Sequence, residues 1–265
     1  MNSLLPSAFL IDMDGVLYHG DRALPHAVVF MRLLQSKPHI FITNNPILLP
    51  EDIAKKLQTL GFSQPELSKI LTSGIATADW LFSQKPGFRY FAIGADGLHQ
   101  ALQKQGVEDA STADFVVIGE GAGIDYASLT TAINLIIKKN AILVLTNPDT
   151  TVDGMCNNRH CILPGGGALV APIQIATGVE PMVIGKPEPL MFRMALARLK
   201  LPAEQCLMIG DRPDTDILGA QSLGIKTALV RTGRFRIEQR LPDGIAPDID
   251  VPDLEALQLA LNLCP

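Results

Sequence analysis

Cysteine is scarce in this chain of 265 residues, so no disulfide framework is expected. Four cysteines, too few and too scattered for a small disulfide-rich domain, are present: Cys156, Cys161, Cys206 and Cys264. We therefore expect reduced thiols. The segment 156–161 does combine two thiols with His160, but a zinc site needs a fourth ligand, and packing of a loop explains the segment equally well.

Long apolar runs and basic clusters are also missing. No stretch of about 18 uninterrupted apolar residues occurs, and residues 1–7 lack the basic start and apolar centre of a secretion signal. Lys and Arg number 22 against 27 Asp and Glu, which gives a net charge of −5 without a dense basic run. We therefore expect a cytoplasmic protein that binds neither nucleic acid nor membrane.

Short apolar runs alternate with longer stretches of helical periodicity, as in βαβ units around a buried parallel sheet. Apolar residues make up 47% and charged residues 18% of the chain, which is an ordinary globular composition. The expected strands are 8–11, 39–42, 70–74, 90–93, 115–118, 141–145, 182–184, 206–210 and 227–230. The expected helices include 27–34, 51–60, 126–137, 189–199 and 252–263. The sequence thus predicts an α/β fold.

The strands that end in acidic residues lie in the first and last thirds of the chain. The middle third contains a βα set of its own, so it is best interpreted as an insertion into one sheet. We predict a core domain formed by residues 1–78 and 182–265, with a smaller α/β domain over residues 79–181.

Polar groups follow four of the predicted strands, and ligands bind beyond the carboxyl ends of strands in an open parallel sheet. These groups are Asp12 and Asp14; Thr43 and Asn44; Lys186; and Asp211, Asp214 and Asp216. Several carboxylates delivered into one crevice are unfavourable unless a cation lies among them, and oxygen ligands of this kind suit Mg²⁺. Each motif alone is commonly a turn or a helix cap. Their order at four successive strand ends is what makes the pattern specific.

The four motifs resemble those of the haloacid dehalogenase superfamily, within it the NagD-like or p-nitrophenyl phosphatase branch. The matching segments are Phe9–Leu17, Ile42–Asn45, Ile184–Pro187 and Ile209–Asp216, and the likeness extends over nearly the whole chain. The resemblance implies a Rossmann-like parallel-sheet core with an inserted α/β cap, and a magnesium-dependent phosphatase activity.

The resemblance also implies a role for each motif residue. Asp12 is expected to attack phosphorus and form an aspartyl-phosphate, while Asp14 protonates the leaving group and activates water. Mg²⁺ is expected to be held by Asp12, the backbone carbonyl of Asp14, and Asp211. Asp216 is expected to orient Lys186 or a metal-bound water.

Substrate contacts are expected from the second and third motifs. Thr43 and the backbone of Asn44 would hydrogen-bond the phosphoryl oxygens, and Lys186 would balance the charge of the nucleophile and phosphate. For Asn45 two roles stay open, one in the turn and one facing the substrate. Asp214 is expected to be a surface carboxylate or a helix cap.

Three further segments have weaker patterns. Gly165–Gly167 is explained by a turn that leads into a helix, although its amides could also face a ligand. Gly119–Gly123 departs from the branch's usual pattern, so we assign it no substrate role. The basic stretch Arg231–Arg240 is more often a solvated face than an anion site.

The resulting hypothesis is a phosphomonoesterase acting on a small soluble phosphate ester, because an inserted cap excludes water and bulky substrates. Sugar phosphates, nucleoside monophosphates, phosphoglycolate, glycerol phosphate and pyridoxal phosphate all stay open. The alternative is a phosphometabolite-binding or phosphoryl-transfer protein of the same fold without phosphatase turnover. A receiver-type signalling domain has about half this length, so it leaves the insertion unexplained. The branch also suggests a homodimer formed through the cap.

Overall fold

The computed structural model describes residues 5–156 and 159–263, which divide into two compact units. The core unit comprises Met1–Thr43, Pro50–Leu71 and Lys186–Pro265, and the inserted unit comprises Asn44–Leu49 and Thr72–Gly185. The inserted unit is therefore wider than the predicted interval 79–181. It includes α3 (Ser73–Gln84), which packs against α4 (Asp96–Gln103) of the same unit.

The core unit is built on a six-stranded sheet with the order β15-β14-β13-β1-β4-β5. The strands are β1 (Ala8–Ile11), β4 (His39–Thr43), β5 (Ile70–Thr72), β13 (Cys206–Gly210), β14 (Lys226–Val230) and β15 (Ile249–Val251). A small antiparallel pair, β2 (Tyr18–His19) and β3 (Arg22–Ala23), follows β1. The pairs around β1, with β13 and with β4, are parallel, and every residue of these three strands is buried. Burial on both faces explains why they are continuous apolar runs.

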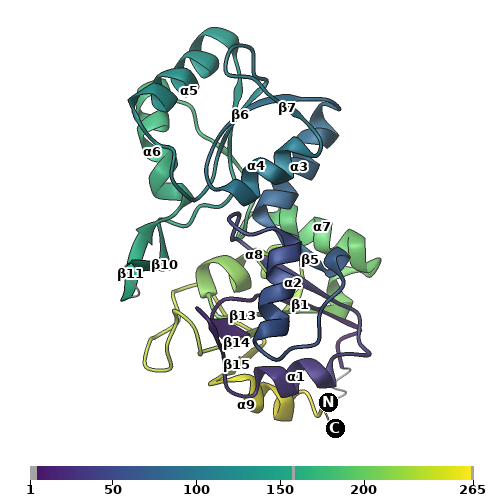
Figure 1. The fold of residues 1–265 in the computed structure, drawn as a ribbon. Helices are drawn as coiled ribbons and strands as arrows, with labels where there is room; N and C mark the ends of the chain where they lie inside the picture. The colour runs from purple at the N-terminus through teal and green to yellow at the C-terminus, as the bar shows by residue number, and fades with distance from the viewer. Residues whose placement is uncertain (1–4, 157–158, 264–265) are drawn as a thin grey trace. The chain divides into compact units, whose positions relative to one another are not determined.

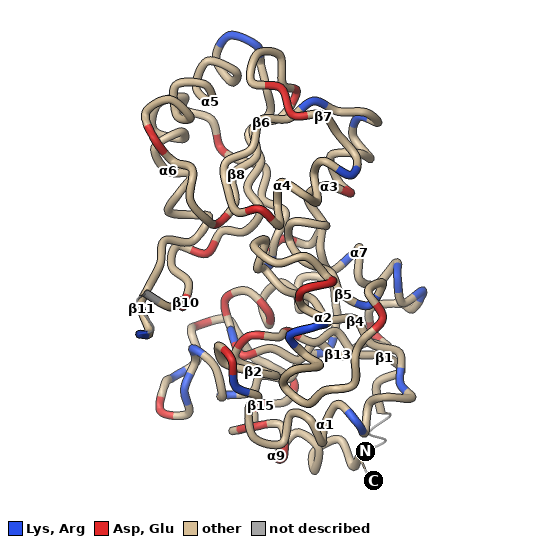
Figure 2. The backbone as a smooth tube through the Cα atoms, in the orientation of Figure 1, with Lys and Arg blue, Asp and Glu red and all other residues tan. Residues whose placement is uncertain are grey.

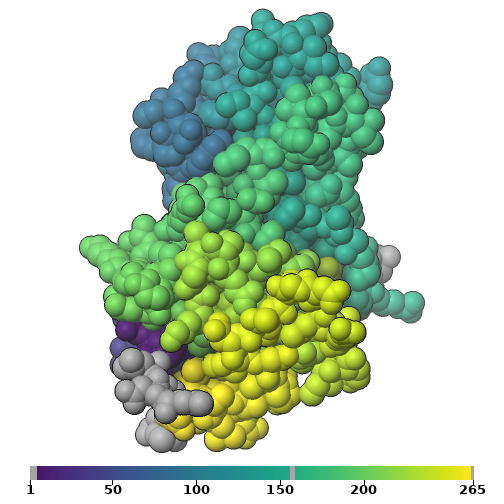
Figure 3. Space-filling view, turned by 180° about the vertical axis from the view of Figure 1, so that it is seen from behind, coloured from purple at the N-terminus to yellow at the C-terminus, as the bar shows by residue number. Residues whose placement is uncertain are grey.

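Helices surround this sheet, as Figure 1 shows for α1, α2, α7 and α9. The helices are α1 (Ala27–Leu33), α2 (Pro50–Thr59), α7 (Pro189–Leu199), α8 (Leu218–Gln221) and α9 (Leu254–Ala260), with the short turns η1 (Leu67–Lys69), η2 (Ala203–Gln205) and η3 (Pro213–Ile217). Helix α7 begins at a proline, whose missing N–H costs nothing in the first turn. Asp253 caps α9 by accepting a hydrogen bond from the Ala256 amide at 2.9 Å. Seen from behind, the yellow C-terminal segment covers one face of the core unit (Figure 3).

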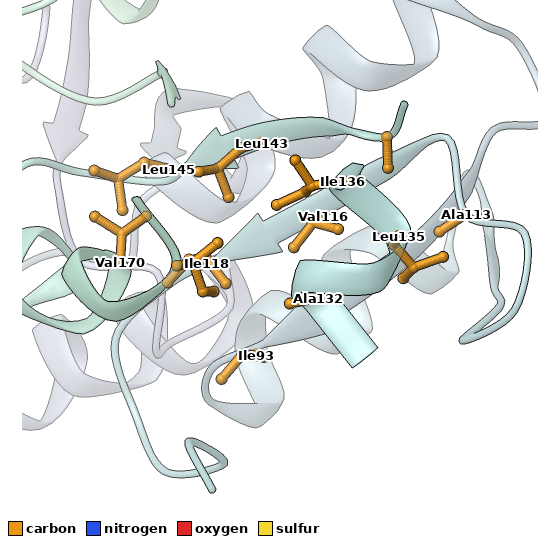
Figure 4. Close-up of a cluster of buried hydrophobic side chains, with 12 residues drawn as sticks. Ile93, Ala113, Val116, Ile118, Ala132, Leu135, Ile136, Leu143, Leu145 and Val170 are labelled. Carbon is orange, nitrogen blue, oxygen red and sulfur yellow. The ribbon is translucent and has the colours of Figure 1, made fainter. Parts of the chain in front are cut away.

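The inserted unit contains a second parallel sheet, with the order β12-β9-β8-β6-β7. Its strands are β6 (Arg89–Ile93), β7 (Val107–Glu108), β8 (Phe115–Ile118), β9 (Ile142–Leu145) and β12 (Met182–Val183). Apolar side chains of β8 and β9 face α5 (Tyr126–Lys139) and α6 (Gly166–Thr177), as Figure 4 shows for Ile118, Leu145 and Val170. Asp125 and Ser128 close a capping box at the start of α5. This unit therefore has a hydrophobic core of its own.

A hairpin of β10 (Thr151–Cys156) and β11 (Arg159–Pro164) extends the inserted unit, and sequence periodicity did not reveal it. Cys161 on β11 is disulfide-bonded, so the expectation of reduced thiols is wrong for this residue. Cys206 is a free, buried thiol as expected, whereas Cys264, Asn157 and Asn158 lie outside the described residues.

Charged residues of both signs are interspersed along the described backbone (Figure 2). Within residues 5–156 and 159–263, no helix combines the length and apolarity needed to cross a bilayer.

Candidate active site

Three adjacent strands of the core sheet deliver motif residues to one edge. The central strand β1 leads directly into Asp12, whose amide donates to the carbonyl of Ile209 on β13 at 2.9 Å. Thr43 is the last residue of β4, and Asp211 follows the last residue of β13. Because these strands run in parallel, their carboxyl ends meet at the same edge. The polar groups that follow them therefore converge.

Lys186 lies at the centre of this group and is only 2% exposed. Its Nζ is 2.5 Å from Asp12 Oδ1 and 2.6 Å from Asp216 Oδ1, and it donates to the carbonyl oxygen of Ile42 at 3.2 Å. Burial acts to lower the pKa of Lys186, but the carboxylates of Asp12 and Asp216 outweigh it and hold that pKa above its ordinary value. Lys186 is therefore a permanent cation that links two carboxylates.

The acidic residues outnumber this cation. Asp12, Asp211 and Asp216 each offer an oxygen within 4.8 Å of the others, and all three side chains are buried. Burial raises the pKa of Asp12 to about 7 against the attraction of Lys186. Burial and the neighbouring carboxylates of Asp12 and Asp216 raise the pKa of Asp211 well above its ordinary value. Three carboxylates beside one ammonium leave a local excess of negative charge.

A divalent cation fits this arrangement. The ligand atoms are all oxygens, which is the donor set that Mg²⁺ prefers, and an added positive charge removes the repulsion that raises the pKa of Asp211. The residues present therefore suit the ion that the sequence pattern suggested. The cluster also contains Asp216, which the family resemblance placed beside the ligands and not among them.

Two glycines permit the carboxylates to pack this closely. Gly15 has a φ of +82°, and a Cβ there would meet Oδ2 of Asp211 at 2.5 Å. Gly210 lies directly against the side chain of Asp216, so a Cβ at this position would overlap it. Any larger residue at either position must displace an acidic side chain.

Asp14 is more exposed than the buried cluster. Its side chain is 59% exposed, and its Oδ1 is 3.8 Å from Nδ1 of His19 on β2. The backbone of Asp14 also forms an isolated β-bridge with that of Tyr18, which anchors the turn after the first motif. A carboxyl group in contact with solvent can exchange protons with water, as a general acid and base must.

Residues of the last motif and of the basic stretch after it have different roles: some lie at the surface or fasten a loop, and others contact the acidic cluster. Asp214 pairs with Arg212 at 2.7 Å and is 62% exposed, in agreement with the surface position expected for it. Arg231 forms a two-pronged ion pair with Asp250 and donates to two backbone carbonyls, so this part of the basic stretch fastens a loop. The same loop supplies the backbone amide of Arg234, which donates to Asp211 Oδ2 at 2.8 Å.

Asn44 and Asn45 belong to the inserted unit. Asn44 donates to Asp149 Oδ2 at 2.9 Å, and its carbonyl accepts from the Ser73 hydroxyl at 2.6 Å. Asn45 accepts from the amide of Ile47 at 2.7 Å, which is the turn contact expected for one of its two roles.

A buried polar network in the inserted unit was missed by the sequence analysis. The Asn147 amide donates to Glu120 Oε1 at 2.7 Å and to Asp149 Oδ2 at 2.8 Å, and it is fully buried. Glu120 and Asp149 are 3% and 6% exposed. The sequence signal is a Glu among glycines together with an Asn-Pro-Asp turn after a buried strand, but spacing alone does not pair them.

Comparisons with known proteins give matches over most of the chain. Residues 9–108 match the family model described as haloacid dehalogenase-like hydrolase, and residues 183–257 match a HAD-hydrolase-like model. The acid sugar phosphatase of Staphylococcus saprophyticus is 35% identical over 251 residues, which are 93% of this chain and 95% of that protein. The corresponding phosphatase of Staphylococcus aureus is 34% identical over 252 residues, again 93% and 95%.

Solved structures agree over nearly the full length. The p-nitrophenyl phosphatase of Archaeoglobus fulgidus matches with a TM-score of 0.89 and 27% identity, over 96% of this chain and 99% of that one. NagD of Escherichia coli K-12 matches with a TM-score of 0.85 and 29% identity, over 95% and 98%. The α/β fold of this chain is thus shared with these solved structures.

Proposed function

The chain belongs to the haloacid dehalogenase-like hydrolases, in the NagD-like branch, and is a phosphomonoesterase; we propose that it hydrolyses a small soluble phosphate ester through an aspartyl-phosphate on Asp12. We further propose that the reaction depends on Mg²⁺ and that Asp14 is its general acid and base. The observation that carries this proposal is the buried pair of Asp12 and Lys186 among carboxylates that one ammonium does not neutralise.

Asp12 has the position and chemistry of a nucleophile. Its Oδ1 is fixed by Lys186 at 2.5 Å, and the ion pair favours the ionised carboxylate that attack on phosphorus requires. In the first step a carboxylate oxygen of Asp12 bonds to phosphorus while the bond from phosphorus to the ester oxygen breaks. The electron pair of that bond leaves with the alcohol oxygen.

Asp14 is proposed to handle the protons of both steps. It donates a proton to the departing alcohol oxygen and then takes one from the water that attacks the phosphoryl group. The bond between phosphorus and Asp12 breaks in this second step, which releases inorganic phosphate and restores the carboxylate. Residues Asp12 and Asp14 lie two positions apart at the end of β1, so one strand places both groups.

The remaining motif residues are proposed to bind and orient. Thr43 and the backbone of Asn44 would contact the phosphoryl oxygens, with Asn45 beside them, and Lys186 would offset the negative charge of phosphate and nucleophile together. Asp12, the backbone carbonyl of Asp14, and Asp211 would hold Mg²⁺. When bound, Mg²⁺ neutralises charge on the phosphoryl group during its transfer. Asp216 orients Lys186 through their 2.6 Å contact.

The relatives indicate which substrates to test first. Two of them are named acid sugar phosphatase, so sugar phosphates head the panel of small esters for this chain. A cytoplasmic location stays a prediction from the sequence composition, and a homodimer formed through the inserted unit stays a prediction of the family resemblance.

The test is phosphate release from that panel, with Mg²⁺ and with a chelator, using D12N as the blank. We expect release that needs the metal and is lost in D12N but retained in D214N, which alters an exposed carboxylate of the same motif. A rapid quench with a labelled ester should trap phosphate on the wild-type chain in acid-stable form. Binding of esters without any release would instead favour the phosphometabolite-binding alternative.

A further inference from the structure

A cavity of about 270 Å³ lies within the core unit, apart from the residues of the phosphoryl chemistry. It is partly open to solvent and is bordered by α1, α2, β4 and the segment 62–69. His39, the first residue of β4, lines it, whereas Thr43 is at the opposite end of the same strand. None of the acidic cluster residues borders this cavity, so the proposed catalysis leaves it without a role.

His39 presents an unused acceptor in this cavity. Its side chain is 93% buried, with 7% exposed, and its Nδ1 lies 2.8 Å from the backbone carbonyl of Lys37. A carbonyl only accepts, so Nδ1 carries the proton and Nε2 has the free lone pair. No hydrogen bond to Nε2 is found among the described residues, and this atom is not one of their fully buried unpartnered atoms, so it is accessible to solvent. Burial lowers the pKa of His39 and outweighs the hydrogen bond to the Lys37 carbonyl, and the charge of Lys69 lowers it further against that of Glu66.

The rim of the cavity has a positive balance. Arg32 and Lys69 border it together with a single acidic residue, Glu66. Lys69 lies 3.1 Å from Glu66, but the Glu66 side chain is 72% exposed, and such a surface pair contributes little. Arg32 has no ion pair among the residues that the structure describes. An entering anion therefore finds Arg32 without an ion-pair partner and Lys69 held only by a surface pair.

One wall of the cavity is apolar and partly aromatic, whereas Gln35, Ser63 and Gln64 make other parts of the lining polar. Phe41 meets the His39 ring edge to face, with centroids 5.4 Å apart and planes at 72°. Leu57 and Phe62 complete this wall and are 1% and 7% exposed. A flat apolar ring can pack against such a wall, while the polar groups of the ligand bond to His39 and to the charged residues of the rim.

We propose that this cavity binds a small organic anion with a flat apolar ring that carries an N–H or O–H group. The ring donor bonds to Nε2 of His39, and the anionic group pairs with Lys69 and Arg32. The volume is slightly below that of ordinary ligand sites of roughly 300–1,000 Å³, which favours a small metabolite over a nucleotide. The proposal holds whatever ester the enzyme hydrolyses.

Indole-3-acetate is a suitable probe because it combines a ring N–H with a carboxylate. The full-length protein, labelled with ¹⁵N in its histidine rings, is titrated with the probe, and the Nε2 resonance of His39 is followed by NMR. The H39Q variant identifies that resonance among the five histidines. We expect a saturable shift toward a hydrogen-bonded Nε2, with a Kd of about 1 mM for a ligand of this size.

A matched pair of lysine variants tests the anion contact. K69M removes a charge from the rim, whereas K55M removes one from an exposed position of α2 that does not line the cavity. We expect about tenfold weaker probe binding in K69M and unchanged binding in K55M. The neutral amide of the probe should bind about tenfold more weakly to the wild type.

Three results would overturn the proposal. The first is a His39 resonance that does not move at saturating probe. The second is equal affinity of K69M and wild type. The third is inhibition of phosphate release that is purely competitive with substrate and occurs without a His39 shift, since it would place the probe in the catalytic site. Amide spectra of each variant, compared with the wild type, establish that the fold is retained.

Discussion

Both units bury acidic side chains, but they neutralise them by different means. In the inserted unit, Glu120 and Asp149 accept hydrogen bonds from the amide of Asn147, and Asp149 accepts another from Asn44. In the core unit, Asp12, Asp211 and Asp216 face one another around a single ammonium group. Neutral donors make the first group a stable structural network. The second group keeps an electrostatic imbalance that a cation or a phosphoryl group can relieve.

The same substitution in both units gives the sharpest contrast. We expect D12N to lower kcat by about 10⁴-fold or more with the fold intact, because an amide cannot replace the attacking carboxylate. D149N should chiefly lower the free energy of unfolding, by about 2 kcal/mol, because its amide faces the donors of Asn44 and Asn147. Steady-state kinetics and urea unfolding measure the two effects. An equal loss of kcat in both variants would show that the comparison is wrong.

Removal of the central cation should affect both activity and stability. We expect K186M to lower kcat by about 10²- to 10³-fold, since charge stabilisation of the phosphoryl group is lost. Asp12 and Asp216 also lose their buried partner, so the free energy of unfolding should fall by about 3 kcal/mol. Urea titrations at neutral and acidic pH check this, because protonation of the carboxylates should recover part of the stability. A stability loss independent of pH would contradict the electrostatic explanation.

The metal-free protein should become less stable as the pH rises. The folded-state pKa of Asp12 is raised from 3.8 to about 7, and that of Asp211 is raised as well. A raised carboxyl pKa adds stability below its ordinary value, and this stability is lost as the pH rises through the folded-state value. The raised pKa of Lys186 acts only above its ordinary value of 10.5, outside this range. Urea unfolding in a chelator should show the decline between 3.8 and about 7, and Mg²⁺ should suppress it.

A charge placed in the inserted unit should make its network resemble the acidic cluster. N147D replaces the shared donor by a third carboxylate beside Glu120 and Asp149. We expect a loss of about 2 kcal/mol in the free energy of unfolding near pH 7, and a smaller loss at acidic pH. The isosteric change controls for packing. If stability at the two pH values falls equally, like-charge repulsion is not its cause.

The smallest effect is expected at the exposed carboxylate of the last motif. D214N removes a surface ion pair with Arg212 and should change the free energy of unfolding by less than about 0.5 kcal/mol, with kcat unchanged. Thermal unfolding and steady-state kinetics measure it. A large loss of activity would mean that exposed carboxylates of this motif contribute to the reaction as well as the buried ones.

Local patterns predicted the elements that carry the core site. Continuous apolar runs identified β1, β4 and β13 because strands buried on both faces lack polar alternation. The residues after them were predicted to converge since parallel strands share a carboxyl edge. Helix α7 was predicted at the bounds it has, because Pro189 starts it and apolar periodicity ends at Leu199.

Long-range pairing was not predictable in the same way. The β10–β11 hairpin has exposed and intermediate positions without a clear apolar pattern, so its local sequence did not indicate it. The scarcity of cysteine favoured reduced thiols, which is wrong for Cys161. Glu120 meets Asn147 over a separation of 27 residues, and composition cannot reveal such a contact. The buried setting of His39 depends on α1, α2 and the segment 62–69 together.

The close approaches at Gly15 and Gly210 also restrict the evolution of this chain. Every single-base change of a glycine codon that alters the amino acid introduces a Cβ, and at these positions that atom overlaps the side chain of Asp211 or Asp216. A deep mutational scan for phosphate release should therefore find both glycines as intolerant as Asp12. In such a map two residues that carry no functional group would rank with the nucleophile. Inheritance of the active site thus depends in part on keeping the space beside Asp211 and Asp216 free of side-chain atoms.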